Sequence, residues 1–462
     1  MHLDGHVRTE PRNQKVNVRT FMRVNVRLLI ALALIACVAP AFAEEAKDHY
    51  KCYDAKPLSS FNGPDVDLVD RFGPTLADVV KLDKLCTPVD KNGEGMVDPN
   101  THLACYSIND DPDFADAQME IWNQFGEESL RITRAGTLCV PTVIDGETAS
   151  GAVDHFKCYR GGTKFDSTIP YSPRDVSAVD RFRTNVDTAE APVAFCNPVD
   201  KNGEGIGSTK SHLECYNVED RALRPLNEVL NVTNQFGSQR IILKRQESLC
   251  VPTRTYDHYT CYGAVYNNDD FQVSLTDEFG NTTATVTKAD KYCVPANKKN
   301  EGLADADTGL TCYTINDPAD VNGLLIDTNN QFGDEILRLN KARTLCVPTK
   351  KVGSDSHLDI EHVKCYQARS GRDDIPFNQI TVPLTDEYSS DDATLIDPVS
   401  YCTIVDKNGE GARFDAARLE CYDISDSSIP PLDIRVDIEN QFGEQNLLLK
   451  RRENICVPTR QR

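Results

Sequence analysis

The sequence has little of what most catalytic or membrane-spanning proteins need. It contains one Trp and four Met, and after residue 43 no apolar stretch is long enough to cross a membrane as a helix. It has no G-x-S-x-G, H-E-x-x-H or phosphate-binding loop and no C-x-x-C pair of the kind that binds zinc. It also lacks a basic stripe, and its formal net charge is -21. These absences argue against nucleic acid as a partner and leave no recognisable catalytic constellation.

The first 43 residues have the pattern of an export signal. Arg23 and Arg27 precede an apolar run from Leu28 to Val38, and the run is followed by the cleavage pattern Ala41-Phe42-Ala43. We therefore expect residues 1–43 to be a signal peptide and the mature protein to be secreted, periplasmic or on the cell surface. The segment ending at Cys37 also fits a loose lipobox, so a lipoprotein anchored through Cys37 is the alternative.

The cysteines support export. Of 17 cysteines, Cys37 lies in the export signal and the other 16 recur at regular spacing, which predicts a disulfide framework. We expect each disulfide to close a loop of about 35 residues and to add about 4 kcal/mol in the chain-entropy model. The alternative is a crossed set that joins each first cysteine to a cysteine of the neighbouring half-unit. The expected pairs are Cys52–Cys86, Cys105–Cys139, Cys158–Cys196, Cys215–Cys250, Cys261–Cys293, Cys312–Cys346, Cys365–Cys402 and Cys421–Cys456.

Each expected disulfide belongs to one copy of a half-unit, and two types of half-unit alternate. Both types open with a Cys-Tyr pair, pass through a strand with period-two alternation to an aromatic turn, and return through a second strand to the second cysteine. No segment sustains a helical period. The residue before the turn is Asp in one type and Asn in the other: Asp70, Asn123, Asp180, Asn234, Asp277, Asn330, Asp386 and Asn440.

This alternation groups the half-units in pairs. We therefore expect an all-β protein of four tandem, small, disulfide-stapled β-sandwich or barrel domains, each an internal duplication. The predicted domains are residues 48–142, 154–253, 257–349 and 361–459.

The repeated polar residues suggest scaffold roles. Six histidines stand three places before a cysteine, and Gly309 and Arg418 replace them in the other two half-units. The Asp or Asn before each turn is expected to bond nearby backbone amides. Because two buried aspartates would repel, we also expect each Asp to lie against the Asn of its own domain, as Asp70 against Asn123. Local capping alone is the competing account.

The motif Asp-Lys-Asn-Gly-Glu-Gly resembles the start of a calcium-binding loop, with oxygen side chains at alternate positions. The full pattern fails because Thr101 and Ser211 stand where a bidentate Glu is required, and the third repeat has Lys299 at a ligand position. Asn-Gly is also a turn signal by itself. We therefore predict a plain turn and no cofactor, with calcium as the alternative. The candidate ligands are Asp90, Asn92, Glu94, Asp200, Asn202, Glu204, Asp406, Asn408 and Glu410.

Taken together, the motifs resemble a known family. The set His-Phe/Tyr-Lys-Cys-Tyr, Cys-x-Pro-Val-Asp-Lys-Asn-Gly-Glu-Gly, His-Leu-x-Cys-Tyr, Asn-Gln-Phe-Gly and Leu-Cys-Val-Pro is similar to that of exported bacterial tandem-repeat domains described only as a domain of unknown function. The resemblance covers nearly all of residues 48–459, and it departs at Lys299, Tyr388 and Ile404. It implies a secreted bacterial protein and implies no activity, ligand or site residue.

Repetition without a unique reactive residue favours a non-enzymatic role, because catalysis usually needs one asymmetric site whereas arrays supply rigid reach and multivalency. We expect a secreted or cell-surface protein with a structural, adhesive or binding function. Its partner would be an extracellular protein or polysaccharide. The alternative is a secreted enzyme or inhibitor with a site between domains.

Overall fold

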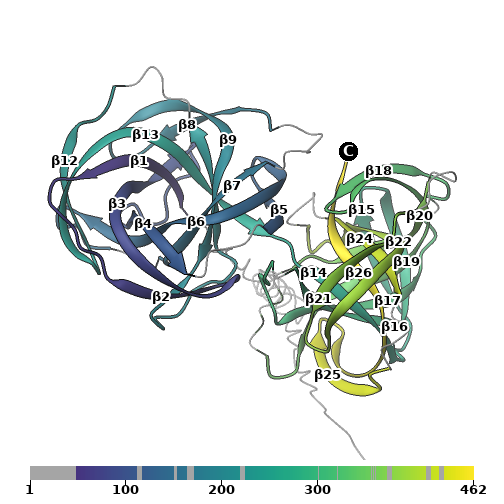
Figure 1. Cartoon of the computed structure of the whole chain (residues 1–462). Helices are drawn as coiled ribbons and strands as arrows, with labels where there is room; N and C mark the ends of the chain where they lie inside the picture. Colours follow the sequence, from purple (N-terminus) through teal and green to yellow (C-terminus); the bar gives the residue numbers. More distant parts are fainter. Residues whose placement is uncertain are drawn as a thin grey trace, which may run out of the picture. The chain divides into compact units, whose positions relative to one another are not determined.

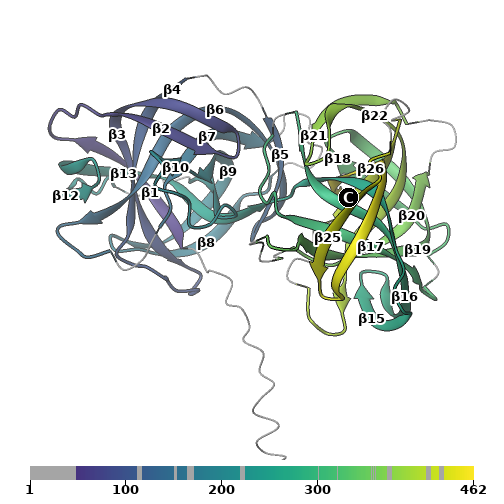
Figure 2. The same ribbon diagram turned by 90° about the horizontal axis from the view of Figure 1, so that it is seen from below.

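The protein is all-β in a computed structural model (Figures 1 and 2). The structure describes residues 48–462 apart from 112–116, 150–152, 164–170, 219–223, 300, 320, 355, 357, 359, 372–376, 413–417 and 426–430. Every regular element in this part of the chain is a β-strand, which confirms the predicted fold class. The predicted signal peptide and Cys37 lie outside the described residues.

Each half-unit forms three strands for reasons visible in its sequence. The first begins with β1 (His49–Pro57), continues with the short β2 (Asp65–Asp70), and returns through the long β3 (Gly73–Lys91). In β2 exposed and buried residues alternate, as expected for a strand with one covered face. The turn between β2 and β3 is closed by Asp70, whose Oδ1 accepts a hydrogen bond from the Phe72 amide at 3.0 Å.

Eight strands of the first four half-units close into a ring. The antiparallel order is β1-β3-β4-β6-β7-β9-β11-β13, and β13 pairs with β1 again. The closure makes a barrel, seen as a ring of strands in Figure 1. Its other strands are β4 (His102–Asp111), β5 (Ala117–Asn123), β6 (Gly126–Ile144), β7 (Phe156–Thr163), β8 (Arg174–Val179), β9 (Thr184–Pro198), β10 (Asp200–Lys201), β11 (His212–Val218), β12 (Glu228–Asn234) and β13 (Gly237–Thr255).

The last four half-units repeat the same closure in the order β14-β16-β17-β19-β20-β22-β24-β26, with β26 pairing with β14. The strands are β14 (His258–Tyr266), β15 (Phe271–Asp277), β16 (Gly280–Lys298), β17 (Thr308–Asn316), β18 (Leu325–Asn330), β19 (Gly333–Lys351), β20 (Val363–Ser370), β21 (Ile380–Thr385), β22 (Ser390–Ile404), β23 (Asp406–Lys407), β24 (Arg418–Ser425), β25 (Ile434–Asn440) and β26 (Gly443–Gln461).

The short hairpin strands pair with a strand of another half-unit as well as with the long strand of their own. The last residues of β3 pair with β8, those of β6 with β12, and those of β13 with β5, while β10 pairs with β2. Each hairpin therefore reaches the half-unit two places further around the ring. The second barrel has the same exchange.

This exchange changes the expected domain organisation. Residues 48–142 and 154–253 do not close separately, because β1 pairs with β13 and β6 pairs with β7. Residues 257–349 and 361–459 are joined in the same way. Two of the predicted repeats, rather than one, therefore make each closed barrel.

Eight disulfides within the described residues join the predicted pairs inside each half-unit. Cys52 lies directly opposite Cys86 in the β1–β3 register, so the bond is a rung between neighbouring strands. Along β1, Tyr50 and Cys52 belong to the cluster inside the barrel. Tyr53 belongs to a separate core beneath the hairpins. The Cys-Tyr strand is thus covered on both sides, as its large residues predicted.

Candidate functional site

Three of the repeated motifs meet in one polar cluster on each odd half-unit. In the first copy, Lys91 Nζ donates to Glu94 Oε1, His49 Nε2 lies 3.5 Å from Glu94 Oε2, and the Gln124 amide nitrogen contacts the His49 ring. Burial is the largest cause lowering the pKa of His49, and the charge of Lys91 adds to it. The other copies are His155, Lys201, Glu204 and Gln235; His258, Lys298, Glu301 and Gln331; and His362, Lys407, Glu410 and Gln441. Each of these histidines thus contacts side chains of its own half-unit and of the next one, as expected for a structural residue.

The candidate calcium ligands have separate protein partners. Asp90 Oδ1 accepts the Gly95 amide at 2.9 Å, Asn92 Oδ1 accepts the Ser177 amide at 2.9 Å, and Glu94 pairs with Lys91. Equivalent bonds hold Asp200, Asn202 and Glu204 in the second repeat and Asp406, Asn408 and Glu410 in the fourth. In the described part of the chain no group of three or more His, Cys, Asp or Glu is placed to hold a metal ion. Asn92 has a φ of 55°, the left-handed value that a turn at Asn-Gly requires.

The Asp and Asn residues before the turns cap those turns and also reach across the barrel. Asp70 Oδ2 accepts a hydrogen bond from Tyr159 at 2.7 Å, whereas Asn123 Nδ2 donates to Tyr216 at 2.8 Å. Each partner is the Tyr after a cysteine two half-units away. Asp70 and Asn123 therefore bond different groups, and the expected pairing of Asp with Asn is wrong. Local capping is confirmed, with a long-range bond added to it.

Charge matching explains the choice of Asp or Asn where the opposed half-unit has a charged residue before its cysteine, whereas Asp386 contacts Thr260. In the opposed half-unit, the residue before the cysteine lies beside this Asp or Asn. The positive charge of Lys157 favours the ionised form of Asp70, whereas Glu214 accepts a hydrogen bond from Asn123 Nδ2. In the second barrel Lys364 Nζ lies 3.3 Å from Asp277, and Asn330 donates to Glu420 at 3.1 Å. A buried Lys faces Asp and a buried Glu faces Asn, because the reverse would leave a buried charge unpaired.

One consequence is a pair of carboxyl groups around a buried tyrosine in each barrel, which the sequence did not predict. In the first barrel Tyr216 lies 2.7 Å from both Glu128 and Glu214. Burial and the charge of Glu128 raise the pKa of Glu214 well above its usual range. The hydroxyl has one proton to donate, so one carboxyl must itself be protonated for both contacts to be hydrogen bonds.

The second barrel repeats this arrangement with Glu335, Tyr422 and Glu420. Burial, followed by the charge of Glu335, raises the pKa of Glu420 to about 8. Paired acids are what hydrolysis of a glycosidic bond requires, but none of these four glutamates lines either barrel lumen or the two smaller pockets near the segment that joins the sheets. The pairs therefore belong to the packing of the barrels.

The disulfides of each barrel form a ring around its axis. In the first barrel Cys52 Sγ lies 3.6 Å from Cys250 Sγ, and Cys139 Sγ lies 3.7 Å from Cys158 Sγ, so neighbouring disulfides touch. A cavity of about 320 Å³ is lined by all eight cysteines. Its buried end is formed by apolar residues two places before four of the cysteines, namely Tyr50, Leu103, Phe156 and Leu213. Its other end has partly exposed polar residues, namely Asp83, Lys84, Ser107, Thr137 and Arg160.

The second barrel has an equivalent cavity of about 290 Å³ within its own eight cysteines. Cys261 and Cys456 are 3.7 Å apart there, and Cys346 and Cys365 are 3.8 Å apart. Its partly exposed end again begins with an Asp-Lys pair, Asp290 and Lys291, which matches Asp83 and Lys84 of the first barrel. The same cavity has thus formed twice from different copies of the repeat.

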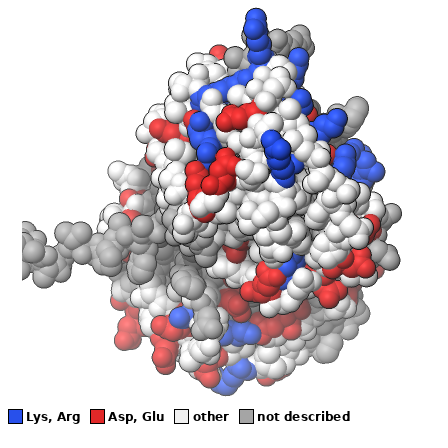
Figure 3. Space-filling model, turned by 90° about the vertical axis from the view of Figure 1, so that its left-hand side faces the viewer, with Lys and Arg blue, Asp and Glu red and all other residues white. Residues whose placement is uncertain are grey.

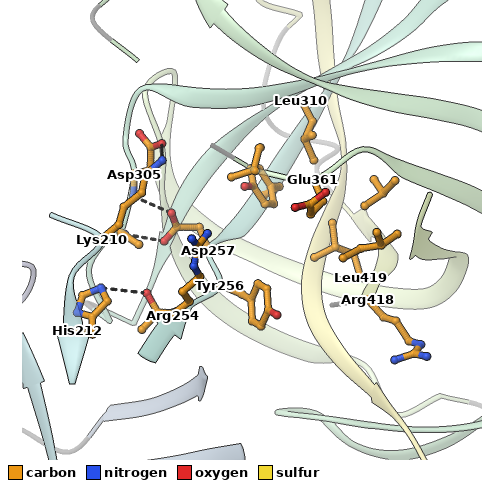
Figure 4. Close-up of a pocket in the computed structure, with 16 residues that line it drawn as sticks. Lys210, His212, Arg254, Tyr256, Asp257, Asp305, Leu310, Glu361, Arg418 and Leu419 are labelled. Atoms are coloured by element: carbon orange, nitrogen blue, oxygen red, sulfur yellow. Dashed lines mark hydrogen bonds and ion pairs between the residues drawn. The ribbon is translucent and has the colours of Figure 1, made fainter. Parts of the chain in front are cut away.

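A further, smaller pocket of about 110 Å³ is lined by residues on both sides of the segment that joins the two sheets (Figure 4). Lys210 and Asp305 form an ion pair at 2.8 Å, and Asp257 accepts hydrogen bonds from the Ala304 and Asp305 amides. His212 stacks on Phe195 with ring centroids 5.2 Å apart. Asp257 and Asp305 are thus engaged by backbone amides and by a cation, and the His212 ring lies 3.5 Å from the Thr255 hydroxyl.

The surface is mixed in charge. On the face shown in Figure 3, acidic and basic side chains are interspersed without a continuous basic stripe. A search of the described residues for a helix able to cross a membrane found none. The eight disulfides fit an oxidising compartment outside the cytosol.

Comparison of the chain with protein-family models, curated proteins and solved structures found no match.

Proposed function

We propose that this chain is an exported, non-enzymatic binding protein and that each barrel holds one small amphipathic molecule in its lumen. The observation that carries the proposal is the recurrence of the same cavity inside both disulfide rings. An eight-stranded barrel is just wide enough to be filled by its own side chains or to hold one small ligand. Here the ring positions carry cysteines, and small residues such as Ser248 and Ser400 lie beside them.

The lining indicates the chemistry of the ligand. Sulfur atoms and apolar side chains surround the inner part of each cavity, which suits an apolar body. Lys84 and Lys291 lie at the partly exposed ends, 32% and 26% exposed, where they pair with Glu247 and Glu453. An anionic or polar head group would bind by replacing these exposed glutamates. A small molecule with an aromatic or alkyl body and an acidic head satisfies both features.

The repeated reactive residues support a non-enzymatic role. Each motif His, Lys and Glu contacts another motif residue in all four copies, and the buried carboxyl pairs lie away from the described cavities. A hydrolase would need a nucleophile and an acid or base directed at the same substrate atoms. The acids that line the two lumens, Asp83 and Asp290, lie at the partly exposed ends, away from the apolar inner part. The disulfide rings give the cavities fixed walls, which lowers the entropy cost of binding.

The test uses 8-anilinonaphthalene-1-sulfonate, an aromatic anion, as the probe. Titration of the full chain should give saturable binding with two sites. Ser248→Phe should fill the first lumen and Ser400→Phe the second, so each variant should lose one site and the double variant both. Ser238→Phe, at an exposed position of β13, is the control. Absence of saturable binding, or two sites retained in a natively folded double variant, would contradict the proposal.

A further inference from the structure

Beneath the hairpins of the first barrel, Lys51, Asn185 and Asp187 form a closed set of contacts. Lys51 Nζ donates to Asn185 Oδ1 at 2.7 Å and lies 3.2 Å from Asp187 Oδ2. Asn185 Nδ2 in turn donates to Asp187 Oδ1. The side chains of Lys51 and Asp187 are 0% and 2% exposed. A primary amine, a carboxamide and a carboxylate therefore meet where water has little access.

The repeat provides its own comparison for this site. Lys157 and Lys364 occupy the same place in their half-units, but their Nζ atoms meet hydroxyl groups, at 2.7 Å from Thr75 Oγ1 and 3.3 Å from Thr282 Oγ1. Counting from the turn, Thr75 and Thr282 hold the position of Asn185, and alanine holds the position of Asp187 in both copies. Lys157 and Lys364 also pair with the carboxylates of Asp110 and Asp317, at 2.8 Å each. Of these three buried lysines, only Lys51 donates to a carboxamide, a group that can acylate an amine with loss of ammonia.

The contacts bring the reacting atoms close. With an ordinary bond angle at the carbonyl oxygen, a 2.7 Å hydrogen bond to Oδ1 places Nζ about 3.5 Å from Cγ of Asn185. Near-attack geometries have separations of about 3–3.5 Å. Both β1 and β9 are strands of the barrel wall, so the two side chains are held on rigid elements.

Asp187 is placed to accept a proton from Lys51 and to return one to the amide nitrogen of Asn185. Its carboxylate contacts both the ammonium group of Lys51 and the amide nitrogen of Asn185. Transfer of one proton from Lys51 to Asp187 leaves Nζ neutral, as attack on a carbonyl carbon requires. The other nearby acid, Asp180, lies 3.9 Å from Nζ and accepts the Tyr53 hydroxyl instead. Asp187 is therefore the group that can act as general acid and base.

We propose that Lys51 and Asn185 form an intramolecular isopeptide bond. Asp187 takes a proton from the Lys51 ammonium, and the neutral Nζ attacks Cγ of Asn185. The Cγ–Nδ2 bond breaks as Nδ2 receives protons from Nζ and from Asp187, and it leaves as ammonium. The products are one secondary amide, one ammonium ion and the regenerated Asp187 carboxylate, with no oxidant or external reactant.

The bond would do what the disulfides do not. Each disulfide stays within one half-unit, whereas Lys51 and Asn185 belong to β1 and β9 of opposed half-units. The cross-link would join the two repeats that build the first barrel.

Peptide mapping of the full-length protein by mass spectrometry tests the inference. After reduction and digestion with trypsin and chymotrypsin, we expect one branched peptide that contains Lys51 and Asn185 and weighs about 17 Da less than the sum of its parts, through loss of ammonia. Trypsin should fail to cleave after Lys51. Separate recovery of unmodified or deamidated peptides from natively folded protein would overturn the proposal.

Two variants separate the chemistry from the fold. Asn185→Thr reproduces the arrangement of the other two copies, so it should fold with all eight disulfides and give no branched peptide. Asp187→Asn keeps both reacting groups but removes the proton acceptor, so cross-linking should slow by about a hundredfold or more. A branched peptide formed at an undiminished rate in Asp187→Asn would exclude Asp187 from the reaction.

Discussion

Replacing Glu420 with Gln should remove much of the dependence of stability on pH in the second barrel. Glu420 is fully buried, and its Oε2 accepts bonds from Thr328 and Asn330 at 3.1 Å each, while its Oε1 has no hydrogen-bond partner. Burial and the charge of Glu335 raise its pKa from 4.5 to about 8. An acid with a raised folded pKa stabilises the fold in its protonated form. That stability is therefore full below the unfolded pKa and is lost as pH rises towards the folded value.

The size of the effect follows from the two pKa values. A shift from 4.5 to about 8 makes the wild type lose on the order of 4 kcal/mol of unfolding free energy between about pH 5 and pH 9. Glu420→Gln cannot ionise, so it should lose correspondingly less, and it should be the more stable protein at the higher pH. Urea unfolding followed by circular dichroism at the two pH values measures the difference, with the exposed Glu444→Gln as control. Equal losses in wild type and Glu420→Gln would refute the reasoning.

Three further outcomes are expected. Asn330→Asp places a second carboxylate beside Glu420 and should lower the unfolding free energy by about 2–4 kcal/mol. Asn440→Asp is the matched control, because its neighbours are hydroxyl groups that can rotate to donate hydrogen bonds. It should lower the unfolding free energy by only about 1 kcal/mol in the same urea assay. The melting temperature should agree within about 1 °C in millimolar calcium and in excess chelator, because the turn carboxylates already have protein partners; a rise with calcium concentration would restore the calcium-site interpretation. Removing the Cys52–Cys86 bond with two alanines should lower the unfolding free energy by about 4 kcal/mol, and an unchanged value would show that the bond constrains nothing.

Local features of the repeat could be predicted from the sequence. Period-two alternation predicted the strands, and the regular spacing of the cysteines predicted disulfides within half-units. The Asp or Asn before each turn predicted the hydrogen bonds that cap the turns. All of these depend on residues within about 40 positions of one another, where spacing and turn chemistry constrain the geometry.

The closure of two repeats into one barrel could not be predicted in this way. Nothing local in β3 indicates that Asp90 and Lys91 will pair with β8, since the choice between a near and a distant hairpin depends on how strands curl in space. The lumens were missed for the same reason. Charge matching, by contrast, had a signal in the sequence: Lys precedes the cysteine in three of the four half-units of the Asp type, and Glu precedes it in two of the Asn type. Comparing those two positions would have suggested the cross-barrel networks.

The most direct test of the account is a crystal structure of the full chain under xenon pressure, with a map of the anomalous scattering. The account predicts two rings of eight sulfur peaks, each made of four disulfides with sulfur contacts at three of the four junctions. It also predicts a xenon peak inside each ring, because a cavity of this size with apolar walls takes up xenon. Disulfides scattered as isolated pairs, or rings whose interiors are filled by side chains and exclude xenon, would contradict it.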